Sequence, residues 1–400
     1  MKETVTVLMV GTGGYGAVYL KELLDETRAK GVQLVGAVDP YVEKSPYVEQ
    51  LREKGIPVYD TLDEFYAAHT AQMAIVSTPI YLHAAQVKIC MENGSDVLCE
   101  KPICSCPEDA AVMLEAQRRT GRKLAIGFQW SFNESILAIK KDILAGKYGH
   151  IKRMRSITYF PRNMEYYRRG GGWAGRRKMP GGEWLLDSVT SNATAHYLHN
   201  LLFLSGSDMQ SAARPNNFTA EVYRINPIEM FDTCAMRLEV GEGTELLYYA
   251  THAVPMDAFR AQDLIIEGEK GKIVMQSGAE GFRTTGHLAN GEIIEYGDPE
   301  HNYFNKIYHM RDAILHDAPL SCVAETALPH LECVWALAEL FPVTPVMPEE
   351  FCAYSEENDQ YYSDTLSADL DLCWKEGKLP SELNMPWAQP ARHWKRENNE

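Results

Sequence analysis

The stretch VTVLMVGTGGYG, residues 5–16, decides the fold of this chain. An apolar run that predicts a strand leads directly into glycines with the spacing GxGxxG, and a helix-like pattern follows through Leu24. A second apolar run, Leu34 to Val38, ends on Asp39. Strand, glycine turn, helix, strand and terminal acid in this order are typical of a dinucleotide-binding βαβ unit.

The glycines and the acid each have a physical role in such a unit. Glycines at positions 11, 13 and 16 let the backbone turn tightly, approach a pyrophosphate and pack the helix against the strand. The N–H groups at the start of the helix attract phosphates. Asp39 can accept hydrogen bonds from the adenosine ribose and would repel a 2′-phosphate, so the sequence favours NAD over NADP.

Residues 1–128 alternate strand and helix patterns, as a Rossmann-type, doubly wound parallel sheet requires. Further strands are predicted at 56–59, 73–76, 96–99 and 123–128, with helices at 46–54, 62–68, 82–93 and 107–120. Ligands of such sheets bind beyond the carboxyl ends of the strands. Thr78, Glu100, Lys101 and Gln129 follow strand ends and are therefore expected to face the cofactor.

Residues 129–345 predict a second domain of α+β type. Apolar residues alternate with period two from Phe218 to Met275, with glycine turns between the runs, which favours a mostly antiparallel open sheet. A strand is also expected at 151–160, and helices at 131–145, from beyond Asp187 to Leu204, and at 329–341. We interpret residues 346–400, with one helix at 367–376, as a tail that packs on the body or on a neighbouring subunit.

Composition narrows the class of protein. The chain has 400 residues and a net charge of -16, which argues against nucleic acid or an anionic membrane as the main partner. No apolar run approaches the ~20 residues that span a bilayer, and the first strand begins too early for a signal peptide ahead of it. Nine cysteines in core-like segments suggest reduced thiols in a cytoplasmic protein. Cys99, Cys104 and Cys106 lack the spacing of a zinc site, so no metal is expected.

Glu100-Lys101-Pro102 completes a set of motifs through which residues 4–345 resemble the Gfo/Idh/MocA family of NAD(P)-dependent sugar oxidoreductases. The set is the glycine fingerprint, Asp39, Thr78-Pro79 and this tripeptide, in order along the chain. The resemblance implies a Rossmann domain that holds NAD and a second domain that holds the substrate. The residues expected to bind the cofactor are Gly11, Thr12, Gly13, Gly14, Tyr15, Gly16, Asp39, Ser77, Thr78, Pro79, His83, Glu100, Lys101 and Gln129.

The resemblance also implies a catalytic role for Lys101, which in the family lies beside the nicotinamide and the reacting hydroxyl. Oxidation of a secondary alcohol removes a hydride and a proton. A lysine next to a positive nicotinamide is pushed toward its neutral form, so it can help to take the proton.

Family members carry a helix motif, Asp-x-x-x-His, that contributes the second catalytic group, and here the chain departs from it. Aligned on the preceding glycines, Asp187 is the aspartate and Ser191 stands where histidine belongs. Aligned on the apolar helix, Asn192 and His196 take the two positions. We favour the second alignment because helix packing is harder to shift than a loop. Asn192 and His196 then share a helical face, His196 can relay the proton, and Asp187 either orients the sugar or caps the helix.

Residues 152–178 are strongly basic for so acidic a chain, with tyrosines and a tryptophan interleaved. Aromatic faces suit sugar rings, and guanidinium groups suit a carboxylate, sulfonate or phosphate. Within this segment the residues expected to bind substrate are Arg162, Tyr167, Trp173 and Arg176.

These features predict an NAD-dependent dehydrogenase that acts on a secondary hydroxyl of a sugar, cyclitol or sugar acid. Two alternatives stay open, because proteins of the same family also include glycosidases with retained NAD and non-catalytic NAD-binding regulators. The altered helix motif is the reason that the glycosidase alternative stays open. A homo-oligomer, dimer or tetramer, is expected because open antiparallel sheets of such domains commonly pack against a copy.

Overall fold

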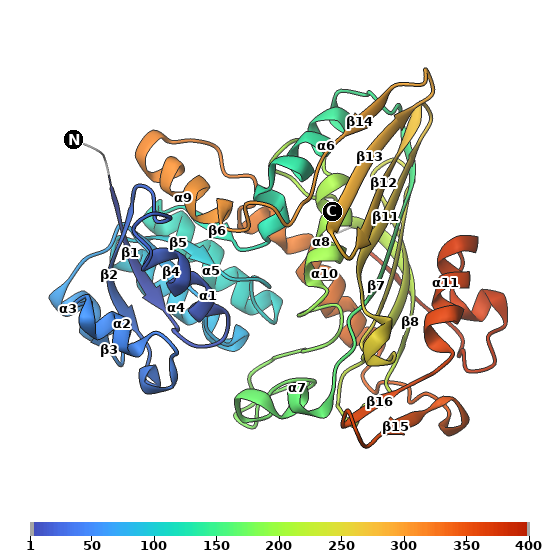
Figure 1. The fold of residues 1–400 in the computed structure, drawn as a ribbon, viewed down its shortest axis with the longest axis horizontal. Helices are drawn as coiled ribbons and strands as arrows, with labels where there is room; N and C mark the ends of the chain where they lie inside the picture. The colour runs from blue at the N-terminus through green and yellow to red at the C-terminus, as the bar shows by residue number, and fades with distance from the viewer. Residues whose placement is uncertain (1–3, 398–400) are drawn as a thin grey trace. The chain divides into compact units, whose positions relative to one another are not determined.

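Figure 1 shows the computed structural model of the chain, which describes residues 4–397. The chain forms two compact units, and each combines distant parts of the sequence. The first contains residues up to Phe132 together with Asn302–Leu328, and the second contains Asn133–His301 together with the residues from Pro329 onward. The predicted fold class, a doubly wound parallel sheet plus an α+β part, is confirmed.

The first unit is built on a six-stranded sheet of order β3-β2-β1-β4-β5-β6, in which all pairs are parallel. The order reverses direction at β1, so the crevice between the strand ends of β1 and β4 is where such folds bind ligands. The strands are β1 (Val5–Val10), β2 (Val32–Val38), β3 (Val58–Tyr59), β4 (Met73–Val76), β5 (Asp96–Cys99) and β6 (Leu124–Ile126).

Local signals explain where the helices of this unit begin and end. A capping box joins Thr61 and Glu64 at the start of α3, and α5 begins with Pro107 and ends at Gly121 in the left-handed conformation. These signals are short-range, which is why the sequence located both helices. The helices between the strands are α1 (Tyr15–Leu23), α2 (Val48–Glu53), α3 (Leu62–Ala68), α4 (His83–Glu92) and α5 (Pro107–Thr120).

One more helix belongs to the first unit, and the sequence did not indicate it. Helix α9 (Asn305–His316) contacts β1 and β5 although more than two hundred residues separate it from them in the sequence. Figure 1 shows this orange helix beside the blue strands. Its buried face includes Lys306, Ile307 and Met310. A lysine on that face obscures the apolar stripe by which an amphipathic helix is normally identified.

The second unit is built on a nine-stranded sheet of order β14-β13-β12-β11-β7-β10-β9-β8-β17. Every neighbouring pair is antiparallel except β7 with β10, as the sequence predicted in the main. The predicted end of the sheet at Met275 was wrong, because two strands follow β12 and one comes from the tail. The strands are β7 (Ile151–Tyr159), β8 (Pro215–Tyr223), β9 (Thr233–Val240), β10 (Thr244–Thr251), β11 (Arg260–Gly268), β12 (Gly271–Gly278), β13 (Gly281–Leu288), β14 (Ile293–Glu295) and β17 (Arg392–Lys395).

The helices of the second unit include one whose predicted start was wrong. We expected a helix to begin at Pro329, but Pro329 lies inside α10. Proline removes one backbone donor, and the buried apolar residues around it, such as Ala327 and Leu331, outweigh that loss. The remaining helices are α6 (Glu134–Leu144), α7 (Met164–Arg168), α8 (Ala195–Leu204), α10 (Ala324–Leu340) and α11 (Leu366–Glu376).

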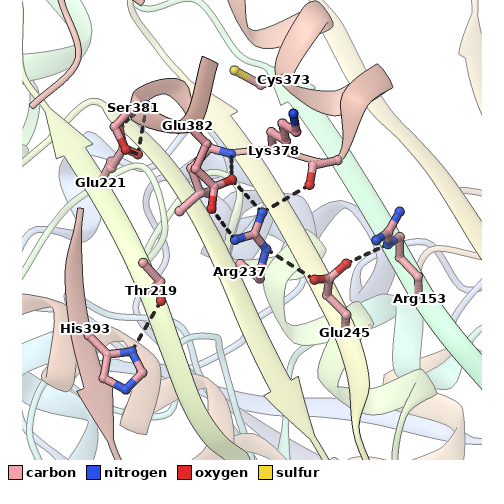
Figure 2. Close-up of polar contacts among 12 residues, drawn as sticks. Arg153, Thr219, Glu221, Arg237, Glu245, Cys373, Lys378, Ser381, Glu382 and His393 are labelled. Carbon is pink, nitrogen blue, oxygen red and sulfur yellow. Dashed lines mark hydrogen bonds and ion pairs between the residues drawn. The ribbon is translucent and has the colours of Figure 1, made fainter. Parts of the chain in front are cut away.

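The tail packs on the second unit of its own chain. Leu366, Leu370 and Trp387 join a buried cluster with Ile157 and Tyr249 of the sheet. Figure 2 shows the polar border of this contact, where Arg237 of β9 binds Glu382 through two hydrogen bonds of 2.6 and 2.7 Å and also pairs with Glu245 at 3.2 Å. The tail therefore covers part of one sheet face, and β17 covers the edge of β8.

Two further findings concern the cysteines and membranes. No disulfide joins the nine cysteines of the described chain, and all but Cys352 are buried. Within residues 4–397, no helix is both long and apolar enough to cross a bilayer.

The buried imidazole of His199 predicts a loss of stability in acid. His199 is 1% exposed, and burial, together with the charges of His330 and Lys140, holds its pKa well below the ordinary 6.5. The pKa of His199 is lower in the folded state than in the unfolded state. Its contribution to the free energy of unfolding is therefore complete above the unfolded pKa and is lost as the pH falls below that pKa. We expect the free energy of unfolding to fall by about 1.4 kcal/mol per pH unit from this group.

Urea unfolding between about pH 7.5 and 5.5 measures this effect. His199→Leu should show a shallower slope than the wild type, whereas His150→Gln, at an exposed histidine, should not. Equal slopes for the wild type and His199→Leu would contradict the prediction.

Candidate functional site

The glycine turn after β1 has the geometry of a phosphate-binding loop. A Cβ at Gly11, where φ is +86°, would lie 2.6 Å from the Ser77 carbonyl oxygen, and one at Gly16 would lie 2.1 Å from the Gly11 oxygen. By contrast, a Cβ at Gly13 or Gly14 would have no heavy atom of the described chain within 4 Å apart from those of the adjoining residues. Helix α1 begins at Tyr15 without a side-chain cap, and its second residue, Gly16, donates its N–H to the Gly13 carbonyl at 2.8 Å. The open backbone at Gly13 and Gly14 leaves room for a pyrophosphate at the start of the helix, so the loop fits the group that the sequence predicts.

Asp39 lies at the end of β2 and is held beside this loop. One carboxylate oxygen, Oδ2, accepts hydrogen bonds from the backbone N and the hydroxyl of Thr12, both at 2.7 Å. The other, Oδ1, accepts from the Tyr41 backbone N at 2.8 Å. Each carboxylate oxygen has a further lone pair, so Asp39 keeps the capacity to accept from ribose hydroxyls.

The expected cofactor residues after β4 hold two loops together. The Ser77 N–H donates to the Val10 carbonyl at 2.8 Å, and the Thr78 hydroxyl donates to Gln86 at 2.5 Å. The buried ring of His83 lies between carbonyl oxygens of the two loops: Nε2 is 3.0 Å from Thr78 O, and Nδ1 is 3.1 Å from Pro102 O. Burial lowers the pKa of His83. His83 thus connects the segment after β4 to the segment that follows Lys101.

Glu100 is the centre of a buried charged cluster that sequence reasoning missed. Its Oε1 accepts from the Tyr19 hydroxyl at 2.6 Å and forms an ion pair with Lys306 of α9, while Oε2 accepts from the Lys101 backbone N at 3.1 Å. Lys306 is 0% exposed, and its Nζ lies 4.8 Å from the ring centroid of Tyr15. Burial lowers the pKa of Lys306, against the charge of Glu100. Through the bond to Glu100 Oε2, the cluster holds the backbone of Lys101 in place.

Two other expected residues of this unit lie at strand ends. Lys101 follows Glu100 directly and is partly exposed. Gln129 is buried at the start of a 3₁₀ turn after β6, and its Oε1 has no hydrogen-bond partner within the described chain. Both residues therefore lie beyond strand ends, where sheets of this kind bind ligands.

In the second unit, the two alternative alignments of the helix motif meet at one point. The Asn192 side-chain amide donates to Asp187 Oδ1 at 2.8 Å, and Asp187 Oδ2 accepts from the Gly175 backbone N at 2.6 Å. The turn between them places Asp187 and Asn192 together, so the motif's aspartate position is occupied by a hydrogen-bonded pair. His196 lies on the first turn of α8, four residues after Asn192, and is partly exposed. His199, one turn further, is buried in the core.

Two arginines of the basic segment gather on aromatic rings. The guanidinium carbon of Arg162 lies 4.4 Å from the ring centroid of Tyr166, and that of Arg169 lies 3.5 Å from the same centroid and 4.8 Å from that of Trp173. Within residues 4–397, no ion pair joins either guanidinium to a carboxylate. Burial and the charge of Arg169 lower the pKa of Arg162. This pair of like charges therefore has no ion-pair partner among the residues that the structure describes.

A closely packed group of side chains lies beside these arginines. Its members include Tyr166, Tyr167, Asp187 and His252. Tyr167 is 6% exposed, and its hydroxyl has no hydrogen-bond partner in the described chain. His252 Nδ1 lies 2.7 Å from the Phe160 carbonyl oxygen, and burial together with the charge of Arg162 lowers the His252 pKa to about 3. His252 is therefore neutral near pH 7, with Nδ1 as donor and Nε2 as a hydrogen-bond acceptor.

Several other basic residues of the segment support the fold. Arg153 binds Glu245 at 2.6 Å, and Arg177 donates to the Ala338 and Phe341 carbonyls at the end of α10. Arg176, expected to bind substrate, donates its Nε to the Gly172 carbonyl at 2.5 Å and so supports its own loop. Composition alone cannot separate these roles, because a pairing residue such as Glu245 lies far away in the sequence.

Sequence reasoning missed three residues of these two clusters: Lys306, Arg169 as a distinct member of the basic group, and His252. Of these three, His252 had a usable signal, since it directly follows the apolar run of β10, which ends at Thr251. In the described chain, no three His, Cys, Asp or Glu side chains gather as they would around a metal ion.

The buried ion pair of Glu100 and Lys306 predicts a large loss of stability on removal of one partner. Lys306→Met leaves the Glu100 carboxylate buried without its counter-ion, and we expect a loss of about 3–5 kcal/mol in the free energy of unfolding. The double variant Glu100→Gln with Lys306→Met should lose less. Lys123→Met is the matched control, because its ion pair with Asp317 is exposed and is worth about 1 kcal/mol at most. Urea unfolding measures all three, and equal losses in Lys306→Met and Lys123→Met would contradict the prediction.

Comparison with known proteins agrees with this geometry. Residues 5–128 match a family model described as "Oxidoreductase family, NAD-binding Rossmann fold". Inositol 2-dehydrogenase of Rubrobacter xylanophilus is 28% identical over 148 residues, which is 37% of this chain and 42% of that protein. The 2,7-anhydro-N-acetylneuraminate hydratase of Mediterraneibacter gnavus is 31% identical over 149 residues, 37% of this chain and 38% of that protein. The chain thus spans about two fifths of the length of the curated relatives it matches.

Solved structures extend the likeness in fold beyond that region. The WlbA dehydrogenase of Bordetella pertussis, solved with NADH and UDP-GlcNAcA, has a TM-score of 0.66 at 21% identity and covers 84% of this chain and 96% of its own. The oxidoreductase of Agrobacterium radiobacter, solved with NAD+, L-tartaric acid and magnesium, has a TM-score of 0.68 at 17% identity, with 83% and 94% covered. The open glycine turn, Asp39 and the Glu100-Lys101 pair thus lie in a region, residues 5–128, that matches the Gfo/Idh/MocA model of NAD-binding oxidoreductases, and the solved structures share the fold of most of the chain.

Proposed function

We propose that this protein is an NAD-dependent oxidoreductase that transfers a hydride between nicotinamide and a secondary hydroxyl of a sugar, cyclitol or sugar acid, and that the substrate carries an anionic group. The observation that carries the redox part is Lys101, which follows β5 and is anchored through Glu100 in a family whose model describes an NAD-binding oxidoreductase. The name of the matched inositol 2-dehydrogenase supports a polyol substrate.

The first unit provides the groups that would hold the cofactor. The open backbone at Gly13 and Gly14 and the uncapped start of α1 suit the pyrophosphate, and Asp39 suits the adenosine ribose. When bound, NAD supplies the hydride acceptor or donor. Gln129 has a buried oxygen that lacks a partner within the described chain, so its amide is available to a polar group of a ligand.

Lys101 is the proposed base for the hydroxyl proton. An ammonium group is a base only after it loses its own proton, and a neighbouring positive charge favours that loss. Glu100 turns its carboxylate toward Tyr19 and Lys306 and forms its buried ion pair with Lys306. The backbone bond from Lys101 N to Glu100 fixes the start of the side chain.

The second unit provides the proposed recognition and relay groups. His196 is partly exposed on the first turn of α8 and can pass a proton near neutral pH. The hydrogen-bonded pair of Asp187 and Asn192 is suited to orient hydroxyl groups. Arg162 and Arg169 lack a carboxylate partner within residues 4–397, so a carboxylate, sulfonate or phosphate of the substrate would supply the missing negative charge. Tyr167 and Trp173 would contact the ring, while Arg176 would act through its loop.

We further propose a cytoplasmic, self-associating protein that binds neither nucleic acid nor membranes. The many buried thiols support the cytoplasmic location. The net charge of -16 argues against nucleic acid and anionic membranes as partners. Because the tail covers the face around β7 and β10, self-association would use other parts of the sheet, such as the strands that carry the exposed Ile293.

A panel of sugars in neutral and acidic pairs, such as glucose and glucuronate, tests the proposal through absorbance of reduced cofactor. We expect the acidic member of a pair to have the higher kcat/KM, because Arg162 and Arg169 would pair with its anionic group. Lys101→Met should lower kcat by about 10²–10⁴-fold while NAD still binds, since it removes the base.

Arg162→Met and Arg169→Met should each reduce the preference for the acidic member by about 10–100-fold, the range of one charged hydrogen bond. Lys152→Met, at an exposed basic residue of the same segment, is the control and should keep the preference for the acidic sugar. No turnover with any sugar would refute the redox proposal, and an unchanged preference in both arginine variants would refute the anionic substrate.

A second candidate function is a redox-neutral hydrolysis or hydration with retained NAD, in which a transient oxidation acidifies the adjacent C–H, a group is eliminated, water adds and the ketone is reduced again. The match to a protein named 2,7-anhydro-N-acetylneuraminate hydratase favours it. So do the extra acid–base groups: the Tyr167 hydroxyl, whose pKa burial raises so that it stays protonated, and the neutral His252.

Deuterium uptake from heavy water separates the two functions. The redox-neutral cycle predicts deuterium next to the oxidised carbon without net formation of reduced cofactor, and Tyr167→Phe should slow the exchange by about 10²-fold or more because it removes a general acid. Mass spectrometry of glycosides of glucuronate after incubation provides the measurement. Stoichiometric reduced cofactor without label would exclude this candidate.

A further inference from the structure

The tail contains a β-hairpin that does not belong to either large sheet. Strands β15 (Ala353–Ser355) and β16 (Gln360–Tyr362) pair antiparallel, and Asp359, with φ +47°, lies at the turn before β16. Figure 1 shows the hairpin in red near α7. Both α7 and the hairpin belong to the second unit.

Asp359 binds both ends of helix α7. Its carbonyl oxygen accepts from the Met164 backbone N at 2.8 Å, and its carboxylate Oδ2 accepts from Arg168 at 2.6 Å. The Tyr354 hydroxyl donates to the other oxygen at 2.8 Å, and these two side-chain bonds lower the pKa of Asp359. Helix α7 has five residues, too few to be stable alone in water, so contacts of this kind decide its position.

The same hairpin also binds the segment that carries His252, a member of the side-chain group beside the arginines. Gln360 is 1% exposed, and its amide donates to the Val254 carbonyl at 2.8 Å. Next to it, the Ser363 backbone N donates to the Ala253 carbonyl at 2.9 Å. These carbonyls directly follow His252, whose ring lies 6.1 Å, centroid to centroid, from that of Tyr166. The hairpin therefore fixes the backbone on two sides, through α7 with Tyr166 and Tyr167 and through the segment of His252.

We propose that the hairpin of residues 353–362 positions the anion-binding group of Arg162, Arg169, Tyr167 and His252, with Asp359 and Gln360 as its positioning residues. This inference rests on the proposed function for the identity of the ligand, whereas the positioning itself concerns only the protein. Arg162 and Arg169 bracket α7, so a shift of this short helix changes the distance between the two guanidinium groups. A tight pair favours a single anion, and a loosened pair loses that preference.

Hydrogen exchange of the amides of residues 160–170, with and without sulfate at matched ionic strength, tests the proposal. Asp359→Asn keeps a residue type that tolerates positive φ but removes the charge, and Gln360→Met keeps the volume but removes the donor. We expect exchange to become about threefold faster in Asp359→Asn, as for an exposed ion pair, and about tenfold faster in Gln360→Met, as for a buried hydrogen bond. Asp364→Asn, at an exposed acid of the same tail, should match the wild type.

Sulfate should slow exchange of residues 160–170 in the wild type and less so in Asp359→Asn and Gln360→Met, while NAD affinity stays unchanged in both. Asp359→Glu, which keeps the charge, should restore the effect of sulfate. Unchanged exchange in both variants overturns the inference. Faster exchange in both variants with no effect of sulfate on the wild type supports the positioning and refutes only the anionic ligand of the proposed function, so the two failures are distinguishable.

Discussion

The carboxylate of Glu100 joins three separate parts of the nucleotide-binding unit. It accepts from Tyr19 of α1 and from the backbone of Lys101, and it forms a buried ion pair with Lys306 of α9. A buried carboxylate is tolerated only when it is paired and hydrogen-bonded. Gly127 must remain without a side chain, since a Cβ there would lie 2.6 Å from the Glu100 carboxylate. The position of Lys101 thus depends on Lys306, 205 positions later. Lys306 belongs to the segment after β14 that is part of the first unit.

In the second unit, two arginines have no carboxylate partner within the described chain. Most of its basic residues end on carboxylates or on carbonyl groups, as Arg153, Arg177 and Arg237 do. Arg162 and Arg169 instead stack on Tyr166 without such a partner in the described chain. Stacking on an aromatic ring keeps a guanidinium ordered while its N–H groups stay available. That difference, rather than the number of basic residues, is what suggests an anionic substrate.

Sequence patterns predicted the first sheet well because its signals are local. Glycine spacing, the capping box at Thr61 and Pro107 at the start of α5 act within a few residues. The same reasoning placed a helix start at Pro329 and was wrong, because proline can be accommodated where buried apolar contacts hold the helix. It also treated Asp187 and Asn192 as competing alignments, whereas the turn between them brings both side chains together.

The sequence by itself determined the Rossmann-type unit, the open sheet, and Asp39 and Lys101 as residues beyond strand ends, since hydrophobic periodicity and turn chemistry act over short distances. Only the tertiary structure decided that Lys306 neutralises Glu100, that His252 is buried and neutral, and that Asp359 holds α7. Burial and pairing depend on which distant segments pack together. Charge states in the core therefore become known only once the chain is folded.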